Sequence, residues 1–417
     1  MAPITVNGRR YARSDRPIVV VCIDGSEPGY IEAAAATGRA PFLSRLLKEG
    51  TSRLAECVVP SFTNPNNLSI VTGVPPAVHG ICGNYFFDRE SGAEVMMNDP
   101  KLLRAGTIFK AFQDQGASIA IVTAKDKLRK LLGHGLKIGP KAVCFSSEFA
   151  DKATLQENGI ADVPALVGMP VPDVYSAGLS AFVFAAGVKI MQRSRPDLMY
   201  LSTTDYIQHK HAPGTPVAND FYVMMDFYLA QLDAMGAIIA LTADHGMNAK
   251  HDSAGQPDVI YLQELMDDWL GAGQARVILP ITDPYVAHHG ALGSFATAYL
   301  PAGADLKAVL QRLAAVPGVE LALTRAEACR RFELPEDRMG DVVIVSTRHK
   351  VLGTARARHD LSGLKEPLRS HGGVSEQKVP LLVNRPTDLP ADARLRNFDV
   401  FDVALNHVKE LVVSHAR

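Results

Sequence analysis

The sequence has almost no excess of charge of either sign and no long basic run. Its 43 lysine and arginine residues against 44 aspartate and glutamate residues give a formal net charge of −1 at pH 7. Nucleic acids and anionic membranes are bound mainly by basic patches and runs. We therefore expect neither a nucleic-acid nor a membrane partner, and any anionic ligand must be bound by a local group of side chains.

Cysteine and long apolar runs are also scarce. The five cysteines are odd in number and form no Cys-x-x-Cys pair, which favours reduced thiols in the interior over disulfides or metal ligands. The N-terminal residues lack the apolar run of a signal peptide, and no stretch reaches the ~20 apolar residues of a membrane span. We expect a soluble, cytoplasmic protein.

The chain of 417 residues is long enough for a large core and two or three structural units. Apolar runs that resemble strands alternate with helical segments, such as those at 40–49 and after Asn64, which predicts a mostly parallel α/β sheet flanked by helices. The candidate strands are Ile18–Ile23, Ala117–Thr123, Leu198–Thr203, Ile238–Thr242 and Pro380–Val383.

The segment 255–367 differs in pattern from the rest. It contains the strand-like runs RVILPI, GSFATAYL, VELALT and DVVIVST, with the helix-like DLKAVLQRLAAV and RAEACRRF between them. We predict a small α+β cap inserted into a catalytic core made of residues 1–254 and 368–417. The alternative is an ordinary extension of that core.

Polar residues gather where the predicted strands meet their loops. Acidic or imidazole side chains follow three of the strands, and one histidine precedes the strand at 380–383. They are Asp24, Asp205, His209, Asp244, His245 and His371. In open α/β sheets, ligands bind outside the carboxyl ends of the strands. Taken singly, each of these residues has an ordinary alternative as a helix cap or a hydrogen-bonded core residue.

Three carboxylates and three imidazoles together form a ligand set for two divalent metals. Thr63 stands just ahead of Asn64 and Pro65, where a helix is expected to begin and its free N–H groups favour an anion. Two metals ~4 Å apart can neutralise both the attacking and the leaving group in a displacement at phosphorus. A threonine hydroxyl needs a metal or a base to react near neutral pH. The set therefore predicts two-metal phosphoryl chemistry beside Thr63.

The motifs around these residues resemble the alkaline phosphatase superfamily. They are IDG at 23–25, PSFTNPNN at 60–67, VTGVPPAVHG at 71–80, NYFFD at 84–88, DYIQH at 205–209, ADHG at 243–246 and SHGG at 370–373. The threonine resembles that of the nucleotide pyrophosphatase/phosphodiesterase branch. Within this branch the chain is similar, over nearly its full length, to the enzymes that hydrolyse phosphonoacetate. The resemblance implies an alkaline-phosphatase-like fold.

The resemblance also implies roles for individual residues. Thr63 would be the nucleophile, and Asn84 would donate a hydrogen bond to a phosphoryl oxygen. Two zinc ions are implied, and Asp/His sites accept Mn²⁺ or Fe²⁺ as substitutes. The implied ligands are Asp205, His209 and His371 for one zinc, and Asp24, Thr63, Asp244 and His245 for the other.

Lys125 and Lys127 follow the predicted strand at 117–123. In a pocket their ammonium groups would need an anion. The alternative is a solvated helix start. In the enzymes that the chain resembles, a similar two-lysine stretch binds the substrate carboxylate. Cleavage of a C–P bond expels a carbanion, which must delocalise into an adjacent carbonyl group stabilised by cations. The expected reaction is hydrolysis of phosphonoacetate to acetate and phosphate.

Two other functions compete with this one. A phosphodiesterase or phosphomonoesterase of the same superfamily would use the same metals on a P–O bond, but a diesterase would replace Lys125 and Lys127 by an apolar slot. A metal- or anion-binding protein without catalysis would have no need of Thr63. The expected partner is a small anionic phosphonate, and the sequence leaves a homodimer open.

Three further histidines have open roles. His289 is predicted to face the pocket and contact the substrate, in which case its neighbour His288 points away if this stretch is a strand. His211 lies two residues after His209 and is an alternative ligand or a partner of a ligand.

Overall fold

The structure is a computed structural model, and it describes residues 2–281 and 292–409. Its centre is an eight-stranded sheet in the order β20-β4-β19-β10-β3-β9-β7-β8. Five neighbouring strands run parallel, which confirms the predicted fold class. They are β10 (Ile238–Thr242), β3 (Ile18–Cys22), β9 (Leu198–Ser202), β7 (Ile119–Thr123) and β8 (Ala142–Ser146).

The remaining strands of this sheet run in both directions. β19 (Lys378–Val383) is antiparallel to β10 and to β4 (Thr51–Glu56), whereas β20 (Leu395–Arg396) is parallel to β4. The sequence did not predict β4, because its side chains alternate between half-buried and exposed with one apolar pair only. Since β19 is antiparallel, the loop before it lies at the same edge as the loops after the parallel strands.

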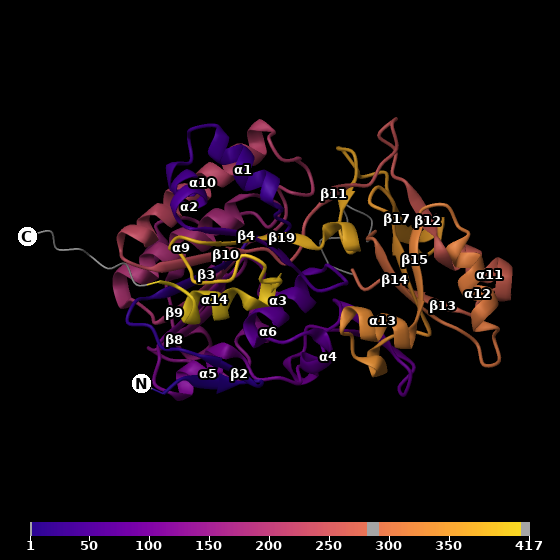
Figure 1. Cartoon of the computed structure of the whole chain (residues 1–417), viewed down its shortest axis with the longest axis horizontal. Coiled ribbons are helices and arrows are strands. Elements are labelled where there is room, and N and C mark those ends of the chain that lie inside the picture. Colours follow the sequence, from indigo (N-terminus) through magenta and orange to yellow (C-terminus); the bar gives the residue numbers. More distant parts are fainter. Residues whose placement is uncertain (1, 282–291, 410–417) are drawn as a thin grey trace, which may run out of the picture.

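Helices cover both faces of the sheet (Figure 1). The alternation of side chains along β3 sends Val19 and Val21 into one apolar cluster and Ile18 and Val20 into another. The first cluster contains α1 (Pro28–Ala36), α2 (Pro41–Glu49), α9 (Gly178–Ser194) and α10 (Pro216–Ala234). The second contains α3 (Thr63–Thr72), α5 (Ile108–Asp114), α6 (Asp126–Leu132) and α14 (Val400–Asn406).

A second sheet lies beside the first and has four antiparallel strands, in the order β13-β14-β16-β15 (Figure 1). The elements expected between 255 and 367 are confirmed, but the boundaries of the cap stay a prediction. The strands are β13 (Arg276–Ile278), β14 (Phe295–Tyr299), β16 (Val342–Ser346) and β15 (Val319–Thr324). The helices are α11 (Leu262–Leu270), α12 (Leu306–Ala314) and α13 (Arg325–Phe332).

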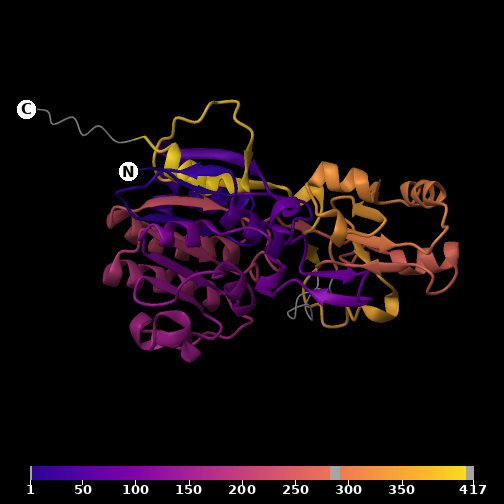
Figure 2. The ribbon, with the colours of Figure 1, turned by 90° about the horizontal axis from the view of Figure 1, so that it is seen from below.

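A hairpin from the first part of the chain packs against this second sheet (Figure 2). It consists of β5 (Tyr85–Asp88) and β6 (Ala93–Met96). The hydroxyl of Tyr299 donates to the Phe87 carbonyl at 3.1 Å, and the two rings meet edge to face. Since one apolar cluster also runs from Ile18 to Phe295, the two sheets share a continuous core.

The shorter elements complete the fold. They are the strands β1 (Ile4–Val6), β2 (Arg9–Tyr11), β11 (Asn248–Ala249), β12 (Val259–Tyr261), β17 (Val351–Gly353) and β18 (Arg369–Ser370), and the helices α4 (Pro76–His79), α7 (Leu155–Asn158) and α8 (Val163–Val167). Among the helices that the structure describes, none has both the length and the apolar character needed to cross a membrane.

Candidate metal centre

Asp205, His209 and His371 form one cluster of possible ligands at the carboxyl edge of the central sheet. The Asp205 carboxylate lies 2.8 Å from Nε2 of His209 and 3.8 Å from Nε2 of His371. A helical turn after β9, closed by the His209 N–H on the Asp205 carbonyl, brings the first two side chains to one side. The third arrives from the loop before β19. One ligand atom from each lies within 4.8 Å of the others.

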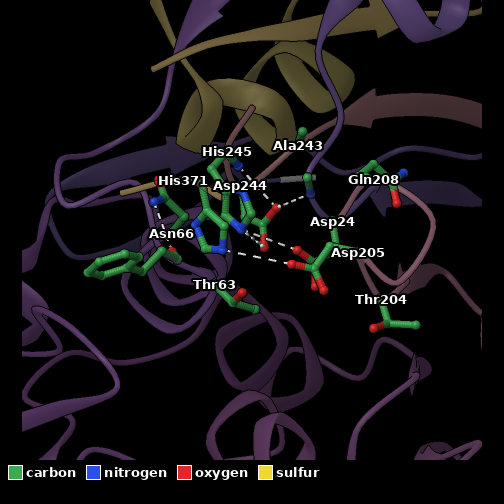
Figure 3. A network of polar contacts seen from close by, with 12 residues as sticks. Asp24, Thr63, Asn66, Thr204, Asp205, Gln208, Ala243, Asp244, His245 and His371 are labelled. Carbon is green, nitrogen blue, oxygen red and sulfur yellow. Dashed lines mark hydrogen bonds and ion pairs between the residues drawn. The ribbon is translucent and has the colours of Figure 1, made fainter. Parts of the chain in front are cut away.

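A second cluster shares Asp205 with the first and adds Asp24 and His245. Nε2 of His245 lies 3.3 Å from Asp24 and 3.9 Å from Asp244. The imidazole rings of His245 and His371 stack in parallel with their centroids 3.6 Å apart. Figure 3 shows the carboxylates and these two rings gathered together, with Thr63 next to them. The structure thus brings together the residues that the sequence placed at separate strand ends.

The three imidazoles are held in one orientation by the backbone. In each, Nδ1 lies at hydrogen-bonding distance from a carbonyl oxygen, which can only accept, so Nδ1 carries the proton and donates it. In a neutral ring Nε2 then keeps its lone pair, which points toward the carboxylates and can bind a metal. Metal-binding histidines are commonly oriented in this way. The acceptors are the carbonyls of Arg369 for His209 (2.8 Å), Gly246 for His245 (2.9 Å) and Ser61 for His371 (2.8 Å).

The buried carboxylates repel one another in the absence of a cation. Burial, followed by the neighbouring Asp205 and Asp244, raises the pKa of Asp24 well above its usual range. Burial also raises the pKa of Asp244. In Asp205 burial acts in the same direction, but His209 and Lys125 outweigh it and hold the pKa well below its usual range. The site is therefore short of positive charge.

The imidazoles respond to the same surroundings in opposite ways. Burial acts to lower the pKa of His245, but Asp244 and Asp24 outweigh it and raise that pKa to about 10. Burial and the neighbouring His245 and His209 lower the pKa of His371 well below its usual range. The metal-free protein thus holds a proton on His245, whereas the ring of His371 is neutral.

Two buried atoms support a metal between them. Oδ1 of Asp24 and Nε2 of His245 have no hydrogen-bond partner, although they lie only 3.3 Å apart. In the metal-free protein the second proton of His245 lies between these two atoms, in an ion pair that lacks hydrogen-bond geometry, and a divalent metal could take the place of that proton. Carboxylate oxygens and imidazole nitrogens are ligands of zinc and related divalent ions. The residues present therefore fit divalent metals, as the sequence predicted.

Thr63 is half-buried and is the first residue of α3. The helix starts one residue earlier than expected. One turn further on, Asn67 donates its amide to the Thr63 carbonyl at 3.1 Å and to Asp244 at 3.2 Å. Asn67 also accepts from the hydroxyl of Tyr200 at 2.7 Å. It therefore connects α3 to the metal cluster. The sequence analysis missed it, although two adjacent asparagines directly before the apolar residues of the helix were a usable signal.

The two lysines after β7 lie in different surroundings. Lys125 is the N-cap residue of α6, and its ammonium nitrogen lies 3.8 Å from the Asp205 carboxylate. Lys127 lies in the first turn of α6 and is exposed. The geometry therefore connects Lys125 to the metal cluster, while contact between Lys127 and a substrate stays a prediction.

Asn84 is connected to the start of α3 through the backbone of Met97. The Met97 N–H donates to the Asn84 carbonyl at 2.9 Å, and the Met97 carbonyl accepts from the side chain of Asn64 at 3.2 Å. The side-chain Oδ1 of Asn84 is buried without a hydrogen-bond partner. Its hydrogen bond to a phosphoryl oxygen stays a prediction.

The other histidines divide into structural and undescribed ones. His288 and His289 lie outside the described residues. His211 uses its carbonyl to accept from the hydroxyl of Tyr30 at 2.8 Å, and among the described residues its ring enters neither metal cluster. His79 is buried, and its Nε2 lies 2.8 Å from the hydroxyl of Ser69, so it ties the turn after α3 to the helix.

Arg369 was not singled out from the sequence, although it precedes the SHGG motif by one residue. Its guanidinium donates to the carbonyl of Gln208 at 2.8 Å and to that of Met247 at 3.3 Å. Its own carbonyl accepts from His209. Arg369 therefore ties together the three loops that carry His209, His245 and His371.

Comparison with known proteins agrees with this geometry. A family model described as type I phosphodiesterase / nucleotide pyrophosphatase matches residues 18–373. The chain belongs to this family. The matched range begins at β3 and ends just after His371, so it contains both clusters of possible metal ligands.

Solved structures of this family share the fold. Phosphonoacetate hydrolase from Sinorhizobium meliloti 1021, solved with phosphonoacetate and with phosphonoformate, is 62% identical with a TM-score of 0.94, over 97% of this chain and 99% of that one. Murine ectonucleotide pyrophosphatase / phosphodiesterase 5 is 17% identical with a TM-score of 0.63, over 94% of this chain and 96% of that one, and shows the fold alone. The fold is therefore the alkaline-phosphatase-like one implied by the motifs.

Two curated relatives match over shorter lengths. Phosphonoacetate hydrolase from Penicillium oxalicum is 61% identical over 41 residues, 9% of this chain and 57% of that sequence. An uncharacterized pyrophosphatase/phosphodiesterase of Schizosaccharomyces pombe is 24% identical over 254 residues, 57% of this chain and 46% of that protein. The chain thus spans about half the length of the curated relatives that it matches.

Proposed function

We propose that this protein hydrolyses the C–P bond of phosphonoacetate to acetate and phosphate. The observation that carries the proposal is the ammonium group of Lys125, which lies 3.8 Å from Asp205 at the edge of the candidate metal centre. A carboxylate attached to a phosphonate could reach this cation while its phosphorus faces Thr63. The 62% identity to a protein solved with phosphonoacetate bound supports the same substrate.

The metal centre would hold two zinc ions. Asp205, His209 and His371 would bind one ion. Asp24, Asp244, His245 and Thr63 would bind the other, and the facing atoms of Asp24 and His245, which lie 3.3 Å apart without a hydrogen bond, support this second site. Bound zinc supplies Lewis acidity, which lowers the pKa of a hydroxyl group and neutralises charge on the phosphonate.

Thr63 would act as the nucleophile in two displacements. Its Oγ attacks phosphorus, the O–P bond forms, and the C–P bond breaks with its electron pair on the methylene carbon. A proton from water converts this carbanion to the methyl group of acetate, and the hydroxide left behind takes up the proton that the Thr63 hydroxyl released. A second water then attacks phosphorus, the bond between Thr63 and phosphorus breaks, and phosphate leaves with the threonine hydroxyl restored. The covalent intermediate is a phosphothreonine.

Lys125 would stabilise the leaving group. As the C–P bond breaks, negative charge moves through the methylene carbon onto the carboxylate. A cation beside that carboxylate interacts more strongly with the transition state than with the ground state, which is the condition for catalysis. A cavity of about 430 Å³ beside His209, lined also by Tyr206, Lys210 and Arg369, offers a route for a small anion.

The zinc-loaded protein is expected to release phosphate from phosphonoacetate much faster than from phosphonopyruvate or 2-aminoethylphosphonate, and to cleave a nitrophenyl phosphodiester slowly. Replacing Lys125 with alanine should lower kcat/KM for phosphonoacetate about 10- to 100-fold, because a hydrogen bond to a charged group is lost. Cleavage of the diester should change little.

Lys127→Ala, assayed in parallel, tests whether the exposed lysine also contacts the carboxylate. Preference for the diester, unaffected by either substitution, would identify a phosphodiesterase instead.

Zinc affinity at the Asp24 site is expected to rise with pH. The pKa of His245 in the metal-free protein is about 10, so a bound metal must displace a proton at neutral pH. Affinity should therefore increase about tenfold per pH unit for each proton displaced between pH 6.5 and 8.5. Competition with a chromogenic chelator at several pH values measures this slope. A flat profile would show that His245 carries no proton in the free protein.

A further inference from the structure

Lys250 and Glu376 form an ion pair that has no exposed surface on either side chain. The ammonium nitrogen lies 2.9 Å from Oε1 of the carboxylate. Lysine is almost never fully buried, and removing two charges from water costs free energy that their attraction does not reliably offset. The pair takes no part in the proposed chemistry. Its position in the fold offers a reason for its presence.

Glu376 holds the backbone on both sides of the stacked histidines. Its Oε2 accepts from the N–H of Gly373, two residues after His371, at 2.9 Å. Its backbone carbonyl accepts from the N–H of Gly246, the residue after His245, at 2.8 Å. Both loops are thus hydrogen-bonded to a single residue. The 3.6 Å stacking of the two imidazoles depends on the spacing between these loops.

Lys250 extends this arrangement to the second sheet. Its other two protons go to the Arg348 carbonyl and to Oγ of Ser294, both at 2.7 Å. Ser294 immediately precedes β14, and its backbone N–H donates to the His371 carbonyl at 2.9 Å. All three protons of the ammonium group are therefore used. They join the loop after β10, the loop before β19 and the loops at one end of the central strands β14 and β16 of the second sheet.

We propose that Lys250 and Glu376 are positioning residues for the metal centre. They set the distance and relative orientation of the loops that carry His245 and His371, without contacting metal or substrate. The proposal rests on the proposed function only in treating these two histidines as metal ligands. An apolar pair of similar volume could fill the same space, but it could not hydrogen-bond the Gly373 N–H or the Ser294 hydroxyl.

The test is a double variant, Lys250→Met with Glu376→Met, which removes both charges and the side-chain acceptor of the Gly373 N–H. Either substitution alone would leave a buried charge unpaired, which is strongly destabilising. A matched control is Arg385→Met with Asp233→Asn, which removes a mostly buried ion pair of 2.8 Å at the opposite end of β10. Zinc affinity is measured by competition with a chromogenic chelator, and thermal unfolding is followed on the same samples.

Zinc should bind about 10- to 100-fold more weakly to the double variant, the range found when partners of metal ligands are removed. The control should bind zinc as the unmodified protein does, even if its Tm falls. Equal affinity in all three proteins would overturn the proposal. If the double variant does not fold, Ser294→Ala is tested instead, because it removes one acceptor of the Lys250 ammonium group. Weaker zinc binding by this variant supports the proposal, and unchanged binding overturns it.

This measurement separates the two proposals, because it uses no substrate. If the unmodified protein binds no divalent metal tightly, the proposed function fails at its first step. If it binds zinc and the double variant binds zinc equally well, only the positioning role of Lys250 and Glu376 is lost.

Discussion

Replacing Thr63 with alanine is expected to lower kcat for phosphate release by about 10³-fold or more, the scale of loss seen when a nucleophile is removed. The hydroxyl lies next to the buried carboxylates, at the N-terminus of α3, where free N–H groups favour an anion. Stopped assays of phosphate release with the zinc-loaded variant measure the loss. Thermal unfolding should change little, because the substituted side chain is half-buried and small.

Thr63→Ser is the matched control, because it keeps a hydroxyl at the same position. It should retain part of the activity. Rapid-quench experiments with labelled substrate should trap phosphate on the unmodified protein and none on the alanine variant. Activity of the alanine variant within tenfold of the unmodified protein would mean that water attacks phosphorus directly, and the two-displacement mechanism would be wrong.

Removal of the metals is expected to abolish activity and to destabilise the fold. Asp24, Asp205 and Asp244 lie together in the interior, where burial and the neighbouring carboxylates raise the pKa values of Asp24 and Asp244. Zinc binds the folded protein and not the unfolded chain, so a thousandfold excess over Kd adds about 4 kcal/mol to the free energy of unfolding. Dialysis against a chelator, followed by stepwise addition of zinc, should restore both activity and Tm.

Asp24→Asn distinguishes the two metal sites. The variant loses a negative charge and a ligand at the site with His245, while the site of Asp205, His209 and His371 keeps all its ligands. We expect the variant to bind one zinc per chain instead of two and to be inactive. Mn²⁺ and Fe²⁺ added to the metal-free protein show whether zinc is required. Full activity after exhaustive metal removal would contradict the two-metal centre.

The sequence predicted the central strands because they are buried on both faces and consist of continuous apolar runs. β10 coincides with its prediction, and β3, β7 and β9 differ from theirs by one or two residues. β4 escaped detection, because a strand near the sheet edge with half-exposed side chains has no continuous apolar run. The sequence also did not predict that β19 runs antiparallel to β10, since the direction of a strand depends on how the connection before it crosses the molecule.

The candidate metal ligands could be named from the sequence because each stands beside a strand end in a short motif. The stacking of His245 on His371 could not be predicted, because those residues are 126 positions apart and meet only through the sheet topology. For a similar reason, the sequence did not predict the roles of Asn67, Arg369 and Glu376. Their hydrogen bonds join loops that are distant in the chain.

The sequence by itself determined the fold class, the family and the chemical types of the ligands, because these depend on local patterns of apolar and polar residues. Only the tertiary structure decided which nitrogen of each imidazole faces the carboxylates, and which of Lys125 and Lys127 lies near them. It also decided that Lys250 is buried. Orientation and burial depend on contacts between residues far apart in sequence, and no local pattern encodes those contacts.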